Sequence, residues 1–311
     1  MSVEMSVVMP AHNRADVLPA TLPPLLAQTL PADAYEVIVV DDGSSDDTPR
    51  VLAAMQTANG RLRSIALPVN RGRSGARNAG IAAARGRIVV FVDSDILVRE
   101  DFLACHLEMH RAQGGWVVSR GPVVPVAGPA EVPNAGIPPL AGSPAYFNTT
   151  NAGVPAEALK RAGWFDEAFP GYGWEDFELG IRLKQLGLRR VFRRRAVAFH
   201  IEPPPQWTAV AADLARETER AHSAVYFFHK HPVWETRLLI QATPAHHAAY
   251  WLQSGGGLIT ADNVAAVARR LQRRGWPTLA ALLYRGVLNR HYLGVLEQEL
   301  AKDQQRSATD A

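Results

Sequence analysis

Residues 88–95 read Ile88-Val89-Val90-Phe91-Val92-Asp93-Ser94-Asp95, so an apolar, β-branched run ends in two aspartates separated by one serine. Such a run is typical of a buried strand. Open α/β sheets bind ligands at the carboxyl ends of their strands. Alternate residues of a strand point to the same side, so we expect Asp93 and Asp95 to converge on one cation, or on a cation and a hydroxyl, with Ser94 turned away.

Similar β-branched runs occupy residues 6–9, 36–41 and 62–66, and helix-length segments separate them. Strands that alternate with helices in this way are typical of consecutive βαβ units. The sequence therefore predicts an α/β fold with a mostly parallel sheet flanked by helices.

Local helix signals agree with this prediction. The run Asp46-Asp47-Thr48-Pro49 supplies an N-cap and a first-turn proline. Ser74 opens a second helical segment, for which Gly86 is the expected residue beyond the C-terminus. Three prolines lie in the first crossover, residues 16–28, which leaves either one interrupted helix or two short turns.

The later part of the chain changes character. Residues 121–144 are rich in proline and glycine and nearly free of charge, which predicts a long excursion over one face without regular helix. Loops of this kind often carry substrate contacts. From residue 213 the pattern is of amphipathic helices, with breaks at Gly255-Gly256-Gly257 and Pro277. We therefore expect a first domain of residues 1–212 and a helical C-terminal extension of residues 213–311.

Composition indicates a folded protein. The 311 residues are 47% hydrophobic and 20% charged, enough for one large α/β domain with an appendage or for two modest domains. The single Cys105 excludes an intramolecular disulfide, and we interpret it as a core residue in a reducing compartment. The sequence shows neither a secretory signal nor a run long and apolar enough to span a bilayer. We expect a cytoplasmic protein whose membrane contact, if any, is peripheral.

Charge is more informative locally than globally. The net charge is only +3, but arginines gather in residues 71–77 and 189–195. Such clusters favour binding of local anions. The basic residues form no stripe interleaved with aromatic residues, so we expect no nucleic-acid partner. The arginines of residues 189–195 and the mixture of Arg, Trp and Leu in residues 269–292 fit either solvated helix faces or an anionic lipid surface.

Four segments in order resemble the family 2 glycosyltransferases, which use nucleotide-sugar donors and have a GT-A fold. They are Ser6-Val7-Val8-Met9-Pro10-Ala11-His12-Asn13-Arg14, Val39-Val40-Asp41-Asp42-Gly43-Ser44, residues 70–95, and Gly171-Tyr172-Gly173-Trp174-Glu175-Asp176-Phe177-Glu178-Leu179. The resemblance covers residues 3 to about 203 and leaves the helical extension outside it.

The resemblance implies a donor site along the sheet edge. It places the nucleoside beside the first segment, a pyrimidine N–H on Asp42, the donor around Arg71 and Arg77, and the ribose or sugar on Asp93. The glycine-rich stretch near Arg71 does not have the dinucleotide-binding spacing. Taken alone, these segments are also compatible with ordinary turns and a solvated basic loop. The implied donor-binding residues are Pro10, Ala11, His12, Arg14, Asp42, Arg71, Arg77, Asp93 and Ser94.

The resemblance also implies a metal site and a base. Asp95 would coordinate a divalent ion together with His200, and this mixed ligation suits Mn²⁺ and tolerates Mg²⁺. Asp176 would be the general base that removes the proton of an acceptor hydroxyl. Glu175, Gly173 and Trp174 would bind or orient the acceptor. The alternative interpretation of His200 is a core or capping histidine. The alternative for Glu175 and Asp176 is that they are favourable charges at a helix N-terminus.

The expected function is transfer of a sugar from a nucleoside diphosphate donor to a hydroxyl acceptor. The family implies inversion and most often a UDP-sugar, whereas retention and guanosine or thymidine donors stay open. The acceptor is a glycan, a lipid-linked molecule or a soluble one. Two alternatives remain, a catalytically silent nucleotide- or glycan-binding module and a sugar nucleotidyltransferase, which releases pyrophosphate. The sequence does not reveal the oligomeric state.

Overall fold

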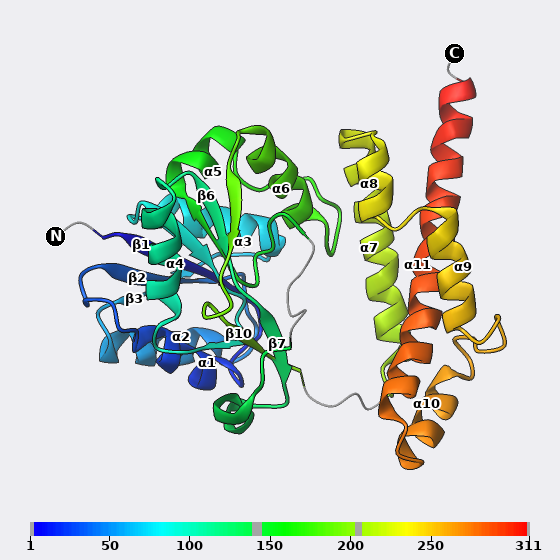
Figure 1. Ribbon diagram of the computed structural model, residues 1–311, viewed down its shortest axis with the longest axis horizontal. Helices are drawn as coiled ribbons and strands as arrows, with labels where there is room; N and C mark the ends of the chain where they lie inside the picture. Colours follow the sequence, from blue (N-terminus) through cyan, green and yellow to red (C-terminus); the bar gives the residue numbers. More distant parts are fainter. Residues whose placement is uncertain (1–2, 139–144, 203–206, 310–311) are drawn as a thin grey trace. The chain divides into compact units, whose positions relative to one another are not determined.

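A computed structural model describes residues 3–138, 145–202 and 207–309 of the chain. Its contacts divide the chain into two units (Figure 1). The first unit comprises Met1–Glu167 and Asp176–Pro204, and the second comprises Ala168–Glu175 and Pro205–Ala311. The segment 168–175 thus groups with the C-terminal helices and not with the sheet that surrounds it in sequence.

The first unit is built on a seven-stranded sheet of order β3-β2-β1-β4-β8-β6-β9. Strands β1 to β4 pair in parallel, as do β6 and β9, whereas β8 is antiparallel to both β4 and β6. The predicted, mostly parallel α/β sheet is confirmed. The strands are β1 (Met5–Ala11), β2 (Tyr35–Asp41), β3 (Leu62–Ala66), β4 (Ile88–Phe91), β6 (Val117–Arg120), β8 (Ala152–Pro155) and β9 (Arg189–Phe192).

Helices cover both faces of this sheet (Figure 1). Because successive strand residues point to opposite faces, Val7 joins a core with α1, α2 and α4, whereas Val8 joins a core with α3, α5 and α6. Both side chains are fully buried. The helices are α1 (Leu18–Leu26), α2 (Thr48–Ala58), α3 (Gly72–Ala83), α4 (Phe102–Ala112), α5 (Ala156–Ala162) and α6 (Glu175–Gln185).

The structure decides between two alternatives for the first crossover and corrects the prediction for Gly86. The first crossover is a single helix, α1, even though Pro23 and Pro24 lie inside it. The helix tolerates them because it is short and both prolines fall in its second half, where the Gln28 side chain donates to the Pro24 carbonyl over 2.9 Å. Gly86 does not follow the end of α3, which ends at Ala83. A Cβ at Gly86 would lie 2.5 Å from the backbone of Met5 and Ser6, so this glycine permits a close approach of two chain segments.

A small second sheet of order β5-β10-β7 completes the first unit. Its strands are β5 (Ile96–Val98), β7 (Val123–Val126) and β10 (Ala198–Ile201), with β10 antiparallel to β5 and parallel to β7. The proline-rich segment 121–144 therefore contains a strand and the 3₁₀ helix η1 (Pro129–Asn134), whereas residues 139–144 lie outside the described part. Pairing of β10 with β5 places His200 opposite Ile96. Since Ile96 follows Asp95 in the sequence, His200 comes close to Asp95.

The second unit contains helices and connecting segments, and its described residues form no strand. The long helix α11 packs on α7, α9 and α10, and its Ala280 and Tyr284 share a core with Val264 and Ala268 of α10. The predicted breaks occur where expected: three glycines with positive φ, from Gly255 to Gly257, separate α9 from α10, and Pro277 opens α11. The helices are α7 (Val210–Lys230), α8 (Trp234–Leu239), α9 (Pro244–Gln253), α10 (Val264–Arg273) and α11 (Pro277–Thr309). Among the described helices, none combines the length and apolar character needed to cross a bilayer.

Candidate active site

The polar residues expected to bind a donor gather where the sheet order reverses. Strand β1 lies between β2 and β4, so the connections that leave β1 and return to β4 run over opposite sides of it. This is the switch point at which open α/β sheets form a crevice beyond their strands. Residues 12–14 follow β1, Asp42 follows β2 and Asp93 lies two residues beyond β4.

Asp42 ties the second strand to the loop before α3. Its Oδ1 accepts a hydrogen bond of 2.7 Å from the Arg71 backbone N–H, and its carbonyl oxygen lies 2.9 Å from His12 Nδ1. Gly43 makes this approach feasible, because its φ is +67° and a Cβ there would lie 2.7 Å from the Asn70 nitrogen. Asp42 is buried, so one carboxylate oxygen already holds the loop in place.

The two arginines expected to contact the donor have different environments. The Arg71 side chain is 48% exposed and its Nη2 lies 2.6 Å from Glu167 Oε2. Arg77 is almost fully buried, lies over the Phe165 ring at 5.5 Å and pairs with Asp93. Arg71 is therefore placed to reach a ligand in solvent, whereas Arg77 pairs with Asp93 from the protein interior.

The two aspartates do not share a strand, which corrects the expectation that strand alternation aligns them. Strand β4 ends at Phe91, and Asp93 to Asp95 form a turn in which the Ile96 N–H donates to the Asp93 carbonyl over 3.2 Å. Each aspartate consequently has its own partners. Ser94 is turned inward and buried, and its hydroxyl accepts a hydrogen bond of 3.1 Å from Arg14 Nε.

Asp93 is held from two sides. Arg77 Nη2 lies 3.0 Å from its Oδ1, and the Thr150 hydroxyl donates to its Oδ2 over 3.0 Å. The sequence reasoning missed Thr150, which lies just before β8 and far from Asp93 along the chain. The carboxylate thus has a fixed orientation at the crevice while its side chain stays 30% exposed.

A buried polar network lies beside Thr150. The next residue, Asn151, donates from Nδ2 to the carbonyl oxygens of Pro122 and Ala196, so its Oδ1 is the acceptor for His106 Nε2 at 3.0 Å. His106 Nδ1 in turn lies 2.7 Å from the Ser119 hydroxyl. Burial lowers the pKa of His106 to about 3, and the ring is therefore neutral. This network fixes the backbone next to the Thr150 hydroxyl.

Asp95 and His200 form the candidate metal pair. His200 Nε2 lies 3.5 Å from Asp95 Oδ1, and its Nδ1 lies 2.7 Å from Glu202 Oε1. Burial favours the neutral acid of Asp95, but the neighbouring His200 and Arg14 hold its pKa below the ordinary value. The neighbouring carboxylates of Asp95 and Glu202 raise the pKa of His200 to about 10.

The donor set of this pair fits a divalent cation. Asp95 Oδ1 is buried and makes no hydrogen bond within the part of the chain that the structure describes. A carboxylate oxygen and an imidazole nitrogen 3.5 Å apart are spaced as two ligands of one ion, and Glu202 is placed to orient the ring. The described residues contain no group of three or more protein ligands, so water and the ligand's own oxygens would complete the coordination.

Asp176 lies in the first turn of α6 and Oδ1 of its carboxylate accepts a hydrogen bond of 2.8 Å from the Phe177 N–H. It lies within electrostatic range of Arg120: burial and Arg190 lower the pKa of Arg120 to about 10, and the Asp176 carboxylate opposes that shift. Asp176 is partly exposed. The Arg120 charge favours the ionised form of this carboxylate, which is the form that a proton acceptor needs.

The residues expected to bind the acceptor belong to the second unit. Trp174, whose φ is +75°, is buried, donates from its indole N–H to the Arg220 carbonyl over 3.0 Å and stacks on Phe227. Gly173 precedes it with a φ of +89°, and Glu175 is buried as well. Trp174 therefore packs into the helices, and its role toward the acceptor stays a prediction.

Comparison with known proteins identifies the first part of the chain. Glycosyl transferase family 2 matches residues 6–128. These residues form a family 2 glycosyltransferase domain. The matched part of the family 2 domain contains the ends of β1, β2 and β4, and hence the switch point described above.

Curated relatives match parts of this chain. Succinoglycan biosynthesis protein ExoO of Rhizobium meliloti is 44% identical over 37% of this chain and 32% of its own length. Validoxylamine A glucosyltransferase of Streptomyces hygroscopicus subsp. jinggangensis is 28% identical over 73% of this chain and 61% of its own length. The chain thus spans less than two thirds of the length of either relative.

Solved structures share the fold of this chain. The mannosyltransferase PcManGT from Pyrobaculum calidifontis, in complex with GDP-Man and Mn²⁺, aligns with a TM-score of 0.59 and 23% identity over 93% of this chain and 87% of its own. TarS of S. aureus, residues 1–349 in complex with UDP, aligns with a TM-score of 0.55 and 19% identity over 96% of this chain and 92% of its own. The GT-A fold expected from the sequence is confirmed.

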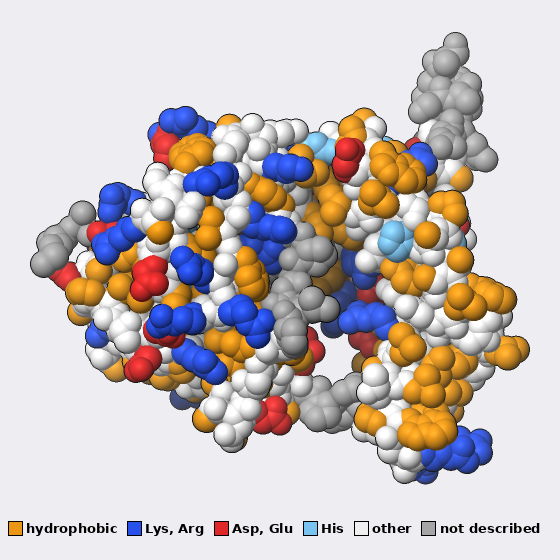
Figure 2. All heavy atoms as spheres, in the orientation of Figure 1, with side chains coloured by type: hydrophobic (Ala, Val, Ile, Leu, Met, Phe, Trp, Pro, Cys, Tyr) orange, Lys and Arg blue, Asp and Glu red, His pale blue; other side chains and the backbone are white. Residues whose placement is uncertain are grey.

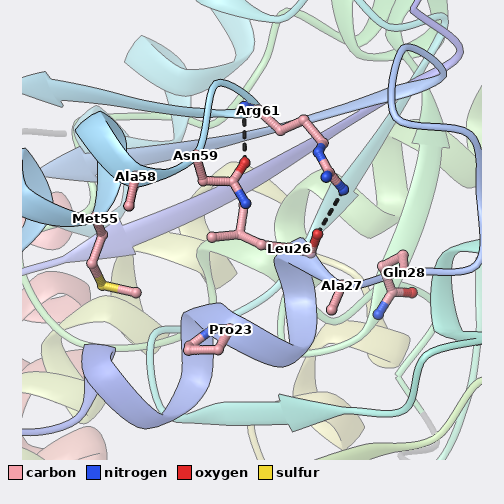
Figure 3. A pocket seen from close by; sticks show the side chains of 8 residues that line it. All are labelled: Pro23, Leu26, Ala27, Gln28, Met55, Ala58, Asn59 and Arg61. Carbon is pink, nitrogen blue, oxygen red and sulfur yellow. Dashed lines mark hydrogen bonds between the residues drawn. The ribbon is translucent and has the colours of Figure 1, made fainter.

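A hollow of about 590 Å³ lies beside α1 and α2, at the end of the sheet opposite to the switch point (Figure 3). Leu26 of α1, Met55 of α2 and Arg61 before β3 line it, and Arg61 Nη1 donates to the Leu26 carbonyl over 2.8 Å. Tyr35, the first residue of β2, bonds the same carbonyl oxygen over 2.7 Å. The hollow therefore lies at the amino ends of β2 and β3, away from Asp42 and Asp93, and we do not assign it to the active site.

Proposed function

We propose that the protein is a metal-dependent glycosyltransferase that moves a sugar from a nucleoside diphosphate donor to an acceptor hydroxyl. Among such donors we favour a UDP-sugar. The observation that carries this proposal is the convergence of Asp93, Arg77 and Thr150 at the switch point of a family 2 domain. The names of the relatives support the reaction class, since they include a glucosyltransferase and a mannosyltransferase.

The donor is proposed to lie across the carboxyl ends of β1, β2 and β4. The free oxygen of Asp42 would accept a hydrogen bond from the base, and the exposed Arg71 guanidinium would reach the diphosphate. Asp93, already oriented by Arg77 and Thr150, would accept a hydrogen bond from the ribose or sugar. Asp95 and His200 would hold Mn²⁺ or Mg²⁺, which neutralises charge on the departing diphosphate.

The chemical step is proposed to be a single displacement with inversion. The acceptor oxygen forms a bond to the anomeric carbon, the bond from that carbon to the diphosphate breaks, and the acceptor proton passes to a carboxylate oxygen of Asp176. The Arg120 charge would favour the ionised form of Asp176 before the transfer. We further propose that residues 1–212 form the catalytic domain and residues 213–311 the extension.

The products test this proposal. Phosphorus NMR of the protein with UDP-glucose, GDP-mannose or dTDP-glucose, Mn²⁺ and a panel of hydroxyl acceptors follows which phosphate leaves. Transfer releases a nucleoside diphosphate, whereas a nucleotidyltransferase releases pyrophosphate. We expect Asp176→Asn to bind nucleotide as the parent does and to release none, and Asp33→Asn, an exposed change before β2, to leave the rate unchanged. Equal rates for Asp176→Asn and the parent would exclude Asp176 as the base.

A further inference from the structure

The C-terminal unit contains a long segment of a single charge sign. Residues 263–296 include six arginines and neither aspartate nor glutamate. The six are Arg269, Arg270, Arg273, Arg274, Arg285 and Arg290. A segment of this kind attracts anions, because no acidic residue of its own offsets the charge.

Helix α10 uses one face for packing and leaves the other in solvent. Val264 and Ala268 are each 1% exposed and pack against α11. Arg270, Arg273 and Arg274 lie on the exposed side. Within the described residues, none of these three guanidiniums forms an ion pair, so their charge is available to an external partner.

Apolar side chains continue this basic surface into α11. Gly275, with a φ of +80°, turns the chain directly after Arg274. Trp276, Leu279 and Leu282 follow at a spacing of three residues, and they are 56%, 39% and 47% exposed. Residues three apart share one side of a helix. We call Arg270, Arg273, Arg274, Trp276, Leu279 and Leu282 the basic-apolar face.

Basic and apolar side chains lie close together in this part of the surface. Figure 2 shows Lys and Arg side chains beside hydrophobic ones where α10 and the start of α11 lie. The Trp276 N–H donates to the Leu271 carbonyl over 3.0 Å, which fixes the tryptophan next to the last turn of α10. Large side chains thus stay in water although Ala280 on the same helix is fully buried.

We propose that the basic-apolar face docks onto an anionic lipid bilayer. Arginines attract the negative leaflet, while Trp276, Leu279 and Leu282 enter the boundary between headgroups and acyl chains. A nucleic acid would engage the arginines but leave the two leucines exposed, and a second copy would oppose charges of the same sign. The inference rests on this surface alone and stands independently of the proposed sugar transfer.

Vesicle co-sedimentation of the full chain tests the proposal. We expect the parent to pellet with vesicles of phosphatidylcholine and phosphatidylglycerol, less so as salt rises, and to stay in solution with phosphatidylcholine alone. Each arginine changed among Arg270→Gln, Arg273→Gln and Arg274→Gln should weaken binding roughly fivefold. The triple variant Trp276→Ser, Leu279→Ser and Leu282→Ser should also lose binding.

The control variant carries Arg50→Gln, Arg87→Gln and Arg161→Gln, which lower the net charge equally at exposed positions of the first unit. Circular dichroism shows that each variant is folded. The proposal is overturned if the folded parent stays in the supernatant. It is also overturned if the control loses vesicle binding as strongly as the variant in which Arg270, Arg273 and Arg274 are all changed to Gln. It is also overturned if the triple variant of Trp276, Leu279 and Leu282 still binds vesicles and single-stranded DNA displaces the parent from vesicles. A further contradicting outcome is that this variant loses only self-association, as measured by sedimentation velocity.

Discussion

Arg77 is almost fully buried, with 2% of its side chain exposed, yet its Nη2 lies 3.0 Å from Oδ1 of Asp93, which is 30% exposed. The arginine therefore reaches from the interior to orient a carboxylate at the crevice. We expect Arg77→Met to lower the free energy of unfolding by about 1–3 kcal/mol, because it removes a hydrogen bond between charged groups. Urea denaturation measures this change. Unaltered stability would show that the pair contributes nothing to the fold.

Thr150 supplies the other hydrogen bond to Asp93, across 3.0 Å. Thr150→Val keeps the volume but removes the hydroxyl. We expect it to weaken nucleotide binding roughly tenfold, because the lost hydrogen bond has a charged carboxylate as its acceptor. Thr150→Ser keeps the donor and should bind as the parent does. Calorimetry of both variants decides the matter, and equal affinities for Val and Ser would assign Thr150 a packing role only.

The neutral His106 makes stability depend on pH. Burial and the neighbouring His110 lower the pKa of His106 from its ordinary 6.5 to about 3. Between these values the unfolded chain binds a proton that the folded chain does not. The free energy of unfolding therefore falls as pH falls through this window, by up to about 1.4 kcal/mol per pH unit.

His106→Gln cannot titrate, so its stability should fall less steeply than that of the parent between pH 6.5 and pH 4.5. His222→Gln, a change at an exposed histidine, serves as the control and should keep the parent's slope. Denaturant unfolding at several pH values measures both slopes. Parallel curves for the His106 variant and the parent would show that this ring is protonated in the folded protein.

Gly43 controls the approach of the Asp42 and Arg71 loops. An alanine there would meet the Asn70 nitrogen at 2.7 Å, and its φ of +67° is strained for any residue with a Cβ. We expect Gly43→Ala to cost about 1–3 kcal/mol of stability and to weaken nucleotide binding. Gly60→Ala is the matched control, since a Cβ at Gly60 meets nothing within 4 Å. Similar melting curves for both variants would contradict this account.

The sequence predicted the parallel strands β1 to β4, because apolar, β-branched residues are enriched in these runs. It did not predict β6, β8 and β9, which are only four residues long. It did not predict that Asp93 and Asp95 lie in a turn, since strand β4 ends at Phe91 and only the bond from Ile96 to Asp93 closes that turn. Asp95 and His200 do meet, because β10 pairs with β5. Their roles, and those of the other predicted site residues, stay predictions.

Thr150 and Trp174 show why the rest of the site could not be predicted. Thr150 precedes β8 and reaches Asp93 only because β8 is inserted antiparallel beside β4, and no local pattern encodes that pairing. Trp174 lies next to Glu175 in a motif that suggests substrate contact, yet it packs on Phe227 of α7. Hydrophobicity alone does not distinguish a packed indole from one that binds a ligand.

Calorimetric titration with UDP, GDP and dTDP, with and without Mn²⁺, tests the central claim most directly. We predict that the parent binds one of these nucleotides in a Mn²⁺-dependent manner. Asp95→Ala should lose the Mn²⁺ dependence, and Asp33→Ala should keep it. Absence of binding to all three nucleotides by folded parent protein would contradict the glycosyltransferase account, and Mn²⁺-dependent binding that survives Asp95→Ala would contradict the proposed metal site.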